Sequence, residues 1–594
     1  MSKEALSIEG SDPQSQNKLA IEANHPLPSE TMNAKHDPSI SFEEYMYYAA
    51  ITRADEKIEN EKYIIASGPK TVKSLLANRF STGRNNAVLE YPSPTSENNE
   101  LERKEGDGSN KRDFGNVSVA EWKNASRAIR TAGWSSIFYL ITTDILGPFS
   151  VPWAFAQMGY GPGIALYTVF GALAMYSGFQ IYKVFIYLDS DRYPVRTFGD
   201  LFFRTYGKWA SHMSNILQTL QLLMSVSILI LANGQAISQI SKGSLCFIAC
   251  LITFAISGML LGQIRTLQRL GWFANLAVWI NLLIMFICMG VVANNPPNFT
   301  AVESSFGPEF AEGPIHRYAG TPPDGAATGG SGFTGSLNGL NQAIYSYGGA
   351  MLFPAFLAEM RHPFDFWKGL LLADVFIYIV YLFFGLFVYS YQGQYSYNPA
   401  FQGLSPYNWQ TASNIMSLIT GLIAAVLYGN IGIKVAYIEV FQEFFNFPPL
   451  TTKKGKIYWC LLVPIYWALA FVICASIPQF SYISGLVGAV CILQFTYTFP
   501  AMLGFGFQIQ KDAMLPDQES FDATTKTYNY VDQGWGRLRR GFKVRWLLNG
   551  FNFFYFLGSL TTAALGIYSS AEGLKGAFEG KSVASSWGCK SPTG

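Results

Sequence analysis

Charged residues are scarce in this chain. Of its 594 residues only 14% are Asp, Glu, Lys or Arg, whereas about a quarter of a typical soluble domain is charged. Apolar residues make up 49% and aromatic residues 15%, and the net charge is only +2. This composition excludes an ordinary soluble enzyme, and the small net charge argues against a nucleic-acid partner. The aromatic excess is typical of a protein that meets two membrane–water interfaces.

Histidine and cysteine, the usual metal and redox residues, are also few. The chain has five histidines and seven cysteines, and it contains no H-E-x-x-H motif, no Walker A loop and no C-x-x-C pair. Six of the cysteines, Cys246 among them, fall in apolar segments, so no disulfide framework is predicted. We therefore expect neither an enzyme nor an ATP-driven pump, and neither a metal site nor a cofactor.

A cleavable secretory signal is lacking too, because residues 1–31 are polar without a short apolar core behind a basic start. Residues 1–132 are predicted to form a cytoplasmic tail that is largely disordered, with short amphipathic helices. One of these covers residues 41–62 and has an aromatic face that includes Phe42 and Tyr45. This helix either covers the cytoplasmic mouth of the membrane domain, binds a partner, or is merely nascent.

Long apolar runs dominate the rest of the chain. Eleven of them are long enough to cross a hydrocarbon core of about 30 Å. They cover residues 134–157, 162–187, 209–237, 244–262, 272–293, 337–360, 366–391, 411–443, 457–477, 480–508 and 545–569. The sequence therefore predicts an all-α integral membrane protein, with an eleven-span domain over residues 133–570 and a tail over residues 571–594.

Lys and Arg are distributed unevenly between the connections. Seven lie between residues 511 and 545, whereas the opposite set of loops holds only Lys242 and Arg317 before the last span. Because cytoplasmic loops collect Lys and Arg, the N-terminus is predicted inside and the C-terminus outside. The longest outside loop, residues 294–336, carries an N-F-T triplet at Asn298, which is a candidate for glycosylation.

Two of the predicted spans contain helix breakers. Residues 144–158 read D-I-L-G-P-F-S-V-P-W-A-F-A-Q-M, with Gly147, Pro148 and Pro152, and the sixth span carries Pro354. Proline removes a helical hydrogen bond, and backbone freed at membrane depth must line a cavity or find other partners. Both helices are therefore predicted to be broken for a function.

The two broken spans also match each other. Residues 147–158 and 349–360 align as G-x-x-x-x-P-x-x-x-A-[QE]-M, and the loop charges give the two spans opposite orientations. Each is followed by four more spans. This pattern indicates a five-plus-five inverted repeat over about residues 134–293 and 337–508, with the eleventh span an addition.

A broken helix can bind a zwitterion. The half that restarts presents free N–H groups and the half that stops presents free carbonyls, which suit a carboxylate and an ammonium group. In the first span the N–H groups around Gly147, Phe149 and Ser150 are expected to hold the carboxylate. In the sixth, the carbonyls of residues 346–348 are expected to face the ammonium.

Side chains at the same breaks are expected to line the pocket, with Phe149, Tyr345 and Tyr347 leading. The third span adds Gln221 and Ser225, spaced by one helical turn, which either contact the substrate or bond neighbouring helices. The predicted substrate-binding residues are Asp144, Gly147, Phe149, Ser150, Tyr345, Ser346, Tyr347, Gly348, Gly349, Gln221 and Ser225.

Ionisable residues within spans cost about 2.5 to 3.5 kcal/mol near the membrane centre, so each needs a reason. Asp144 lies one turn before Gly147 and either pairs with the ammonium, holds a coupling proton, or serves packing alone. Asn430 and Lys434 share a helix face, where Lys434 is either a second proton-coupling candidate or snorkels to the inner interface. Asp374 is predicted to have a structural role.

At these residues the chain resembles the amino acid/auxin permease family. The matching pieces are I-L-G-P-F-S-V-P-W-A-F-A-Q-M-G-Y from residue 145 and Y-S-Y-G-G-A-M-L-F-P-A-F-L-A-E-M-R-H-P from residue 345. The tail piece F-E-E-Y-M-Y-Y-A-A-I-T-R-A resembles filamentous-fungal members. The resemblance implies a leucine-transporter-like fold and secondary transport of amino acids, usually coupled to protons. Pro148 and bulky Phe149 depart from the family pattern.

The sequence thus predicts proton-coupled import of neutral amino acids by alternating access. Its expected partners are the amino acid, protons and the bilayer, with no nucleic acid, and the plasma membrane is favoured over the vacuolar membrane. Two alternatives stay open: a vacuolar exporter or exchanger, and a membrane amino acid sensor that signals through cytoplasmic partners of its N-terminal tail.

Overall fold

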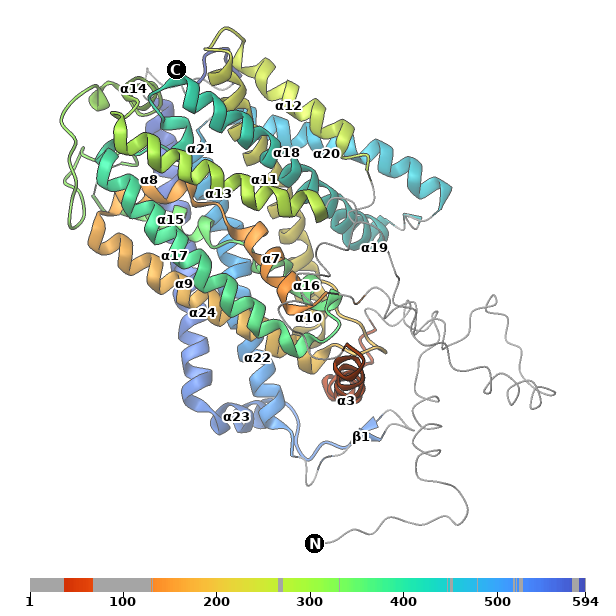
Figure 1. The fold of residues 1–594 in the computed structure, drawn as a ribbon. Coiled ribbons are helices and arrows are strands. Elements are labelled where there is room, and N and C mark those ends of the chain that lie inside the picture. The colour runs from red at the N-terminus through yellow and green to blue at the C-terminus, as the bar shows by residue number, and fades with distance from the viewer. Residues whose placement is uncertain are drawn as a thin grey trace, which may run out of the picture.

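Helices make up most of the computed structural model (Figure 1). It describes residues 37–67, 130, 132–264, 271–330, 332–445, 447–448, 452–477, 479–515, 519, 521–522, 527–579 and 587–592. The helix predicted at residues 41–62 is present as α3 (Phe42–Ser67). The remainder of the predicted N-terminal tail falls almost entirely outside the described residues.

Eight helices in the described part are long and apolar enough to cross a membrane, and α12 is a shorter apolar helix. The eight are α9 (Tyr160–Leu188), α11 (Lys208–Ile240), α13 (Gly271–Asn294), α17 (Phe366–Gln392), α18 (Tyr407–Val435), α20 (Lys453–Ser476), the run from α21 (Phe480–Val487) to α22 (Phe499–Ala513), and α24 (Trp546–Glu579); α12 is Phe247–Leu261. With the two broken helices described below, they account for the eleven predicted spans and confirm the fold class.

Shorter elements connect these spans or lie within them. They are α10 (Phe198–Tyr206), α14 (Phe299–Phe306), η3 (Pro308–Phe310), η5 (Pro363–Asp365), η6 (Gly393–Tyr395), η7 (Ala400–Gly403), the π-helical η8 (Ala436–Phe441), α19 (Gln442–Phe445), the π-helical η9 (Gly488–Ile492) and η10 (Gln494–Thr498), and α23 (Trp535–Val544). Strands β1 (Phe521–Asp522) and β2 (Thr527–Tyr528) pair antiparallel.

Both helices predicted to be broken are broken. Each consists of an α-helix, a single 3₁₀ turn and a second α-helix. The first is α7 (Trp134–Ile145), η1 (Pro148–Ser150) and α8 (Val151–Met158); the second is α15 (Gly332–Ser346), η4 (Ala350–Leu352) and α16 (Phe353–Glu359). Pro148, Pro152 and Pro354 all lie in the first turn of a restarting segment, where no helical N–H bond is lost.

The two broken helices run antiparallel. Near the end of α8, the Gln157 amide donates to Thr328 Oγ1 at 2.9 Å, just before α15 begins. At the other end, Ala132 just before α7 donates its N–H to the carbonyl of Glu359, the last residue of α16, at 3.1 Å. The start of each helix therefore lies beside the end of the other, which is the arrangement expected of the inverted repeat.

The two ends of the helical bundle differ. Helices α3 and α23 lie at one end, and α14 and the C-terminal segment lie at the other (Figure 1). At the α14 end a disulfide joins Cys246 and Cys589, 343 residues apart. The prediction of no disulfide framework is therefore wrong for this pair. Cys246 caps the start of α12 instead of lying inside the span, and its partner comes from the distant tail.

Candidate functional site

The two helix breaks are in direct contact inside the bundle. The hydroxyl oxygens of Ser150 and Ser346 lie 3.1 Å apart. A side chain at Gly349 would bring its Cβ within 2.7 Å of the Asp144 carboxylate and into collision with Ile145. The lack of a side chain at position 349 therefore allows the break of the second helix to lie against the break of the first.

Tyr381 of α17 bridges both breaks. Its hydroxyl donates to the carbonyls of Ile145, at 2.5 Å, and Ser346, at 2.7 Å. The same oxygen accepts the N–H of Gly147 at 3.3 Å. Because a hydroxyl has one hydrogen and two lone pairs, the two carbonyls share a single donor. Sequence reasoning missed Tyr381, since a tyrosine within an aromatic-rich span gives no local signal.

Asp144 is held by a second tyrosine that the sequence did not indicate. The hydroxyl of Tyr428, on α18, donates to Asp144 Oδ1 at 2.8 Å. Among the described residues, no Lys, Arg or His forms an ion pair with this carboxylate. Asp144 therefore has a neutral hydroxyl, not a fixed cation, as its neighbour within the span.

The predicted pair of Asn430 and Lys434 lies on a different face of α18. Asn430 is fully buried and donates from Nδ2 to the carbonyl of Ile264, just beyond α12, at 2.7 Å. Lys434 is one turn further along the same helix face. Tyr428, two residues before Asn430, points instead to the first break. The structure thus brings Asp144 together with Tyr428 and not with Asn430.

The aromatic residues at the breaks point in two directions. The half-buried ring of Phe149 packs edge-on against Phe401 of η7, with ring centres 5.0 Å apart, and against Phe384 of α17. Tyr347 is buried and donates its hydroxyl to the Tyr167 carbonyl of α9 at 3.1 Å. Phe149 and the half-buried Tyr345 are therefore better placed than Tyr347 to line a space at the breaks.

Accessible surface reaches the first break. Gly147 is exposed although α7 and α8 both pack against α17, and a Cβ built on it would meet only its own helix at 3.9 Å. Asp144 and Phe149 are half-buried beside it. The accessible part of the first break is thus Gly147, with a carboxylate and an aromatic ring beside it.

Other predicted residues make contacts of a different kind. The Ser225 hydroxyl donates to the carbonyl of Gln221 in its own helix at 2.9 Å, and Gln221 Oε1 is buried without a hydrogen-bond partner among the described residues. Gly348 packs against Ile492 of the π-helical η9. Asn298 caps α14 by accepting the Ala301 N–H at 3.1 Å.

Asp374 is a further buried acid that the sequence assigned to structure. It is half-buried on α17, two turns before Tyr381, and its Oδ2 has no hydrogen-bond partner among the residues that the structure describes.

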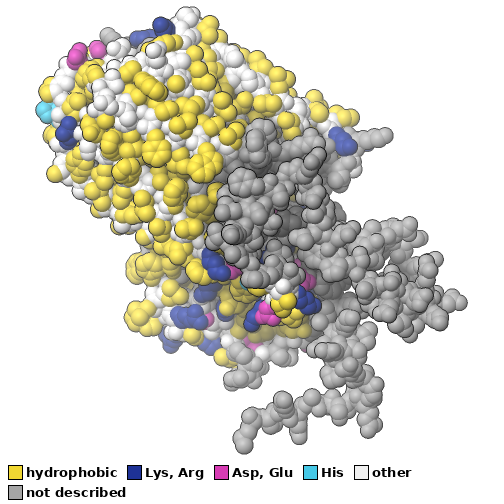
Figure 2. All heavy atoms as spheres, viewed as in Figure 1, with side chains coloured by type: hydrophobic (Ala, Val, Ile, Leu, Met, Phe, Trp, Pro, Cys, Tyr) yellow, Lys and Arg dark blue, Asp and Glu magenta, His cyan; other side chains and the backbone are white. Residues whose placement is uncertain are grey.

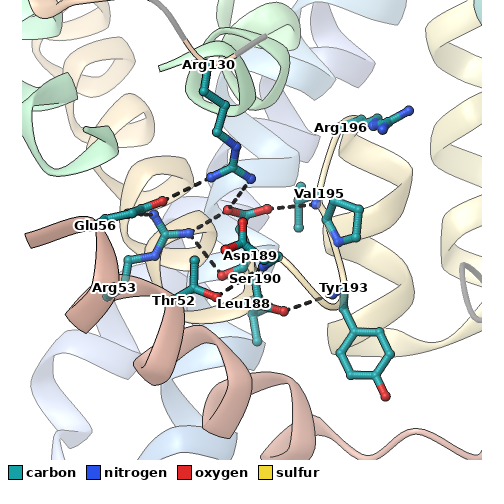
Figure 3. Close-up of polar contacts among 12 residues, drawn as sticks. Thr52, Arg53, Glu56, Arg130, Leu188, Asp189, Ser190, Tyr193, Val195 and Arg196 are labelled. Carbon is teal, nitrogen blue, oxygen red and sulfur yellow. Dashed lines mark hydrogen bonds and ion pairs between the residues drawn. The ribbon is translucent and has the colours of Figure 1, made fainter. Parts of the chain in front are cut away.

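A network of ion pairs joins α3 to the membrane domain (Figure 3). Arg53 contacts Glu56 at 2.6 Å and Asp189, just after α9, at 2.5 Å. Arg130, shortly before α7, contacts the same two acids at 3.0 and 3.3 Å. All four side chains are at least 85% buried, since their exposed fractions lie between 0% and 15%. Helix α3 is therefore docked by charges that water does not screen.

The two acids of this network titrate differently. Burial raises the pKa of Glu56 to about 7, despite the opposing effect of Arg53 and Arg130. Burial also acts to raise the pKa of Asp189, but Arg130, Arg53 and the Val195 N–H together hold it below its usual value. Asp189 has a backbone donor, at 2.9 Å, in addition to the arginines, whereas the charges of Asp189 and Asp191 further raise the pKa of Glu56.

Helix α3 also reaches other segments at the same end. Glu43 pairs with Arg537 of α23 at 2.6 Å. Asn60 accepts a hydrogen bond at 3.4 Å from Arg361, which directly follows the second broken helix. Together with Arg130, these contacts connect α3 to the outermost ends of both broken helices.

Comparisons with known proteins found similar transport proteins of fungi. The chain is 25% identical over 392 residues to a transmembrane transporter of Gibberella moniliformis, covering 63% of this chain and 75% of that protein. It is 23% identical over 449 residues to the N amino acid transport system protein of Neurospora crassa, covering 72% of this chain and 86% of that protein.

Among solved structures, the chain is similar to a manganese transporter of Eremococcus coleocola in complex with an aromatic bis-isothiourea substituted compound. The TM-score is 0.38 and the identity 11%, with 78% of this chain and 97% of that chain covered. The model of the transmembrane amino acid transporter protein family matches residues 130–514, more than half of the chain. The chain therefore belongs to the transmembrane amino acid transporter protein family.

Proposed function

We propose that this transporter imports neutral amino acids together with protons by alternating access. The observation that carries the proposal is the meeting of two antiparallel helix breaks, where the Gly147 N–H and the Ser346 carbonyl are bonded by the hydroxyl of Tyr381 and not by a helix. A carboxylate would bind at the N–H groups of Gly147 and its neighbours, and an ammonium at the carbonyls near Ser346.

In this proposal Tyr381 occupies the place of the substrate. Its hydroxyl bonds the Gly147 N–H and the Ser346 carbonyl, which are the groups assigned to the two charged ends of an amino acid. Substrate binding therefore requires the hydroxyl to give way. Tyr381 would satisfy these backbone groups when the site is empty, because polar backbone at membrane depth cannot be left unpaired.

Asp144 and Tyr428 are the proposed proton site. A carboxyl at membrane depth with no cationic partner among the described residues is costly when charged, so a proton or a substrate ammonium must neutralise it. Phe149 and Tyr345 give the remaining wall an apolar, aromatic character, which favours neutral side chains over charged ones.

We assign the α3 end of the molecule to the cytoplasm and the plasma membrane as the location. Lys and Arg gather in the loops at the α3 end, and the Cys246–Cys589 disulfide at the opposite end suits an oxidising, extracytoplasmic compartment. Helix α3 then covers the cytoplasmic mouth. Because it holds Arg130 and Arg361 at the ends of both broken helices, inward opening requires these contacts to loosen.

Uptake into proteoliposomes tests this proposal. Purified protein is reconstituted, and a panel of labelled amino acids is offered with and without an inward-directed acid gradient. We expect neutral amino acids to accumulate only with the gradient. Accumulation that ignores the gradient would remove proton coupling, and binding without counterflow would favour a sensor over a transporter.

A further inference from the structure

Helix α23 (Trp535–Val544) presents one face to the membrane domain and one away from it. It lies at the same end as α3 and leads directly into the span α24 (Figure 1). A Cβ on Gly541 would collide with the Ile509 carbonyl, so α23 touches the backbone of α22. On this side Arg537 pairs with Glu43 at 2.6 Å and Arg540 with Asp532 at 2.8 Å.

The opposite face combines exposed apolar and basic side chains. Trp535 is 87% exposed and Leu538 41% exposed. Arg539 and Lys543 are exposed beside them, and neither forms an ion pair with any residue that the structure describes. At 100° per residue, Trp535, Leu538 and Arg539 lie on the half of the helix turned away from Arg537 and Arg540, and Lys543 lies at the edge of that half. The outward face of α23 is defined here as Trp535, Leu538, Arg539 and Lys543.

This face continues into a surface that must meet lipid. Just beyond α23, Trp546 and Leu547 at the start of α24 are 62% and 68% exposed, and α24 is long and apolar enough to cross a membrane. Figure 2 shows Lys and Arg side chains gathered at the lower end of the molecule, below a surface rich in hydrophobic side chains. Trp535 and Leu538 thus lie next to the edge of the hydrocarbon layer.

A helix with aromatic and aliphatic residues on one side and Arg or Lys at its edge is typical of a helix that lies in the membrane interface. Trp prefers the headgroup level, and Arg and Lys there attract anionic lipid. An acidic soluble peptide would also attract Arg539 and Lys543. It would not account for Trp535 and Leu538 continuing the surface of a membrane span.

We propose that the outward face of α23 is a binding site for anionic phospholipid headgroups in the leaflet at the α3 end. Arg539 and Lys543 contact the lipid phosphate, and Trp535 and Leu538 insert at the boundary of the acyl chains. The guanidinium of Arg539 suits a phosphate because its fork of N–H groups can bind two oxygens at once. This site does not depend on which substrate the protein carries.

Hydrogen exchange of the full chain in nanodiscs tests the site. Discs of phosphatidylcholine alone are compared with discs that also contain phosphatidylserine, and exchange is followed in the peptide that covers residues 535–544. We expect phosphatidylserine to slow exchange there. Equal exchange in both discs would overturn the proposal, as would equal protection by free inorganic phosphate in phosphatidylcholine discs.

A charge-matched pair of variants gives the second readout. Arg539→Gln with Lys543→Gln removes two basic side chains from α23, while Arg317→Gln with Lys575→Gln removes two exposed ones elsewhere. Titration with fluorescent phosphatidylserine in neutral detergent should show roughly thirty-fold weaker binding for the α23 variant only. Equal affinity of both variants, at unchanged thermal stability, would refute the assignment. Arg539→Lys with Lys543→Arg should restore binding.

Discussion

Replacing Tyr381 with Phe tests the proposed exchange between its hydroxyl and the substrate. The change removes one donor that the carbonyls of Ile145 and Ser346 share, and one acceptor for the Gly147 N–H. Ile145 and Ser346 are 7% and 4% exposed, so water replaces the donor poorly, whereas Gly147 is exposed. Leaving one buried polar group unpaired costs about 1–3 kcal/mol.

This loss of free energy mainly destabilises the substrate-free state of the protein. When an amino acid is bound, its ammonium pairs with the Ser346 carbonyl, and the loss of the hydroxyl is compensated. We therefore expect Tyr381→Phe to lower the melting temperature of the substrate-free protein and to tighten substrate binding. If about 1–2 kcal/mol of the cost is removed on binding, affinity should rise roughly 5–30-fold.

The assay is thermal unfolding of purified protein titrated with a substrate from the uptake panel. Tyr389→Phe is the matched control, because its hydroxyl accepts the Tyr318 N–H at 3.0 Å, two turns further along α17. The control should lose stability without a change in affinity. Weaker binding in Tyr381→Phe, with the control unchanged, would mean that the hydroxyl contacts the substrate directly, and the exchange argument would fail.

Four further predictions concern other parts of the molecule. Asp144→Asn should abolish stimulation of uptake by an acid gradient while counterflow of substrate persists; an intact response would exclude Asp144 as the proton site. Phe149→Ala should admit larger side chains in competition assays, and an unchanged substrate range would mean that Phe149 does not line the pocket. Since the pKa of Glu56 is raised to about 7 in the docked state, docking of α3 should weaken as pH rises between about 4.5 and 7, by up to about tenfold per pH unit; hydrogen exchange of α3 should show this trend, and Glu56→Gln should flatten it. Alkylation of the unfolded chain, followed by intact mass, should label two more cysteines after reduction than before, and Cys589→Ser should remove that difference; equal labelling would contradict the Cys246–Cys589 bond.

Patterns within single segments of the sequence were enough to predict the helices and their breaks. Apolar runs longer than a bilayer core predicted the spans, because a helix that crosses lipid satisfies its backbone only within itself. Gly147, Pro148 and Pro354 predicted both breaks, since proline removes a hydrogen bond from the interior of a helix and is tolerated in its first turn. The opposite loop charges predicted the antiparallel pairing that Ala132 and Glu359 confirm.

No such pattern predicted which side chains contact the broken helices. Tyr381 meets Ile145 across 236 residues and Tyr428 meets Asp144 across 284. On α18 the sequence favoured Asn430 and Lys434 because they are polar, but the rotation of the helix in the bundle turns Tyr428 to the first break instead. Helix rotation depends on packing with every neighbour, which a pattern within one span does not contain.

The sequence by itself therefore determined that this is an eleven-span membrane protein with two matching, oppositely directed broken helices. These properties depend on hydrophobicity, backbone chemistry and charge along single segments. Only the tertiary structure decided which side chains complete the breaks, how α3 docks through Arg53 and Asp189, and that Cys246 pairs with Cys589. Each of these contacts joins segments distant in sequence, whose meeting is fixed by the packing of the whole bundle.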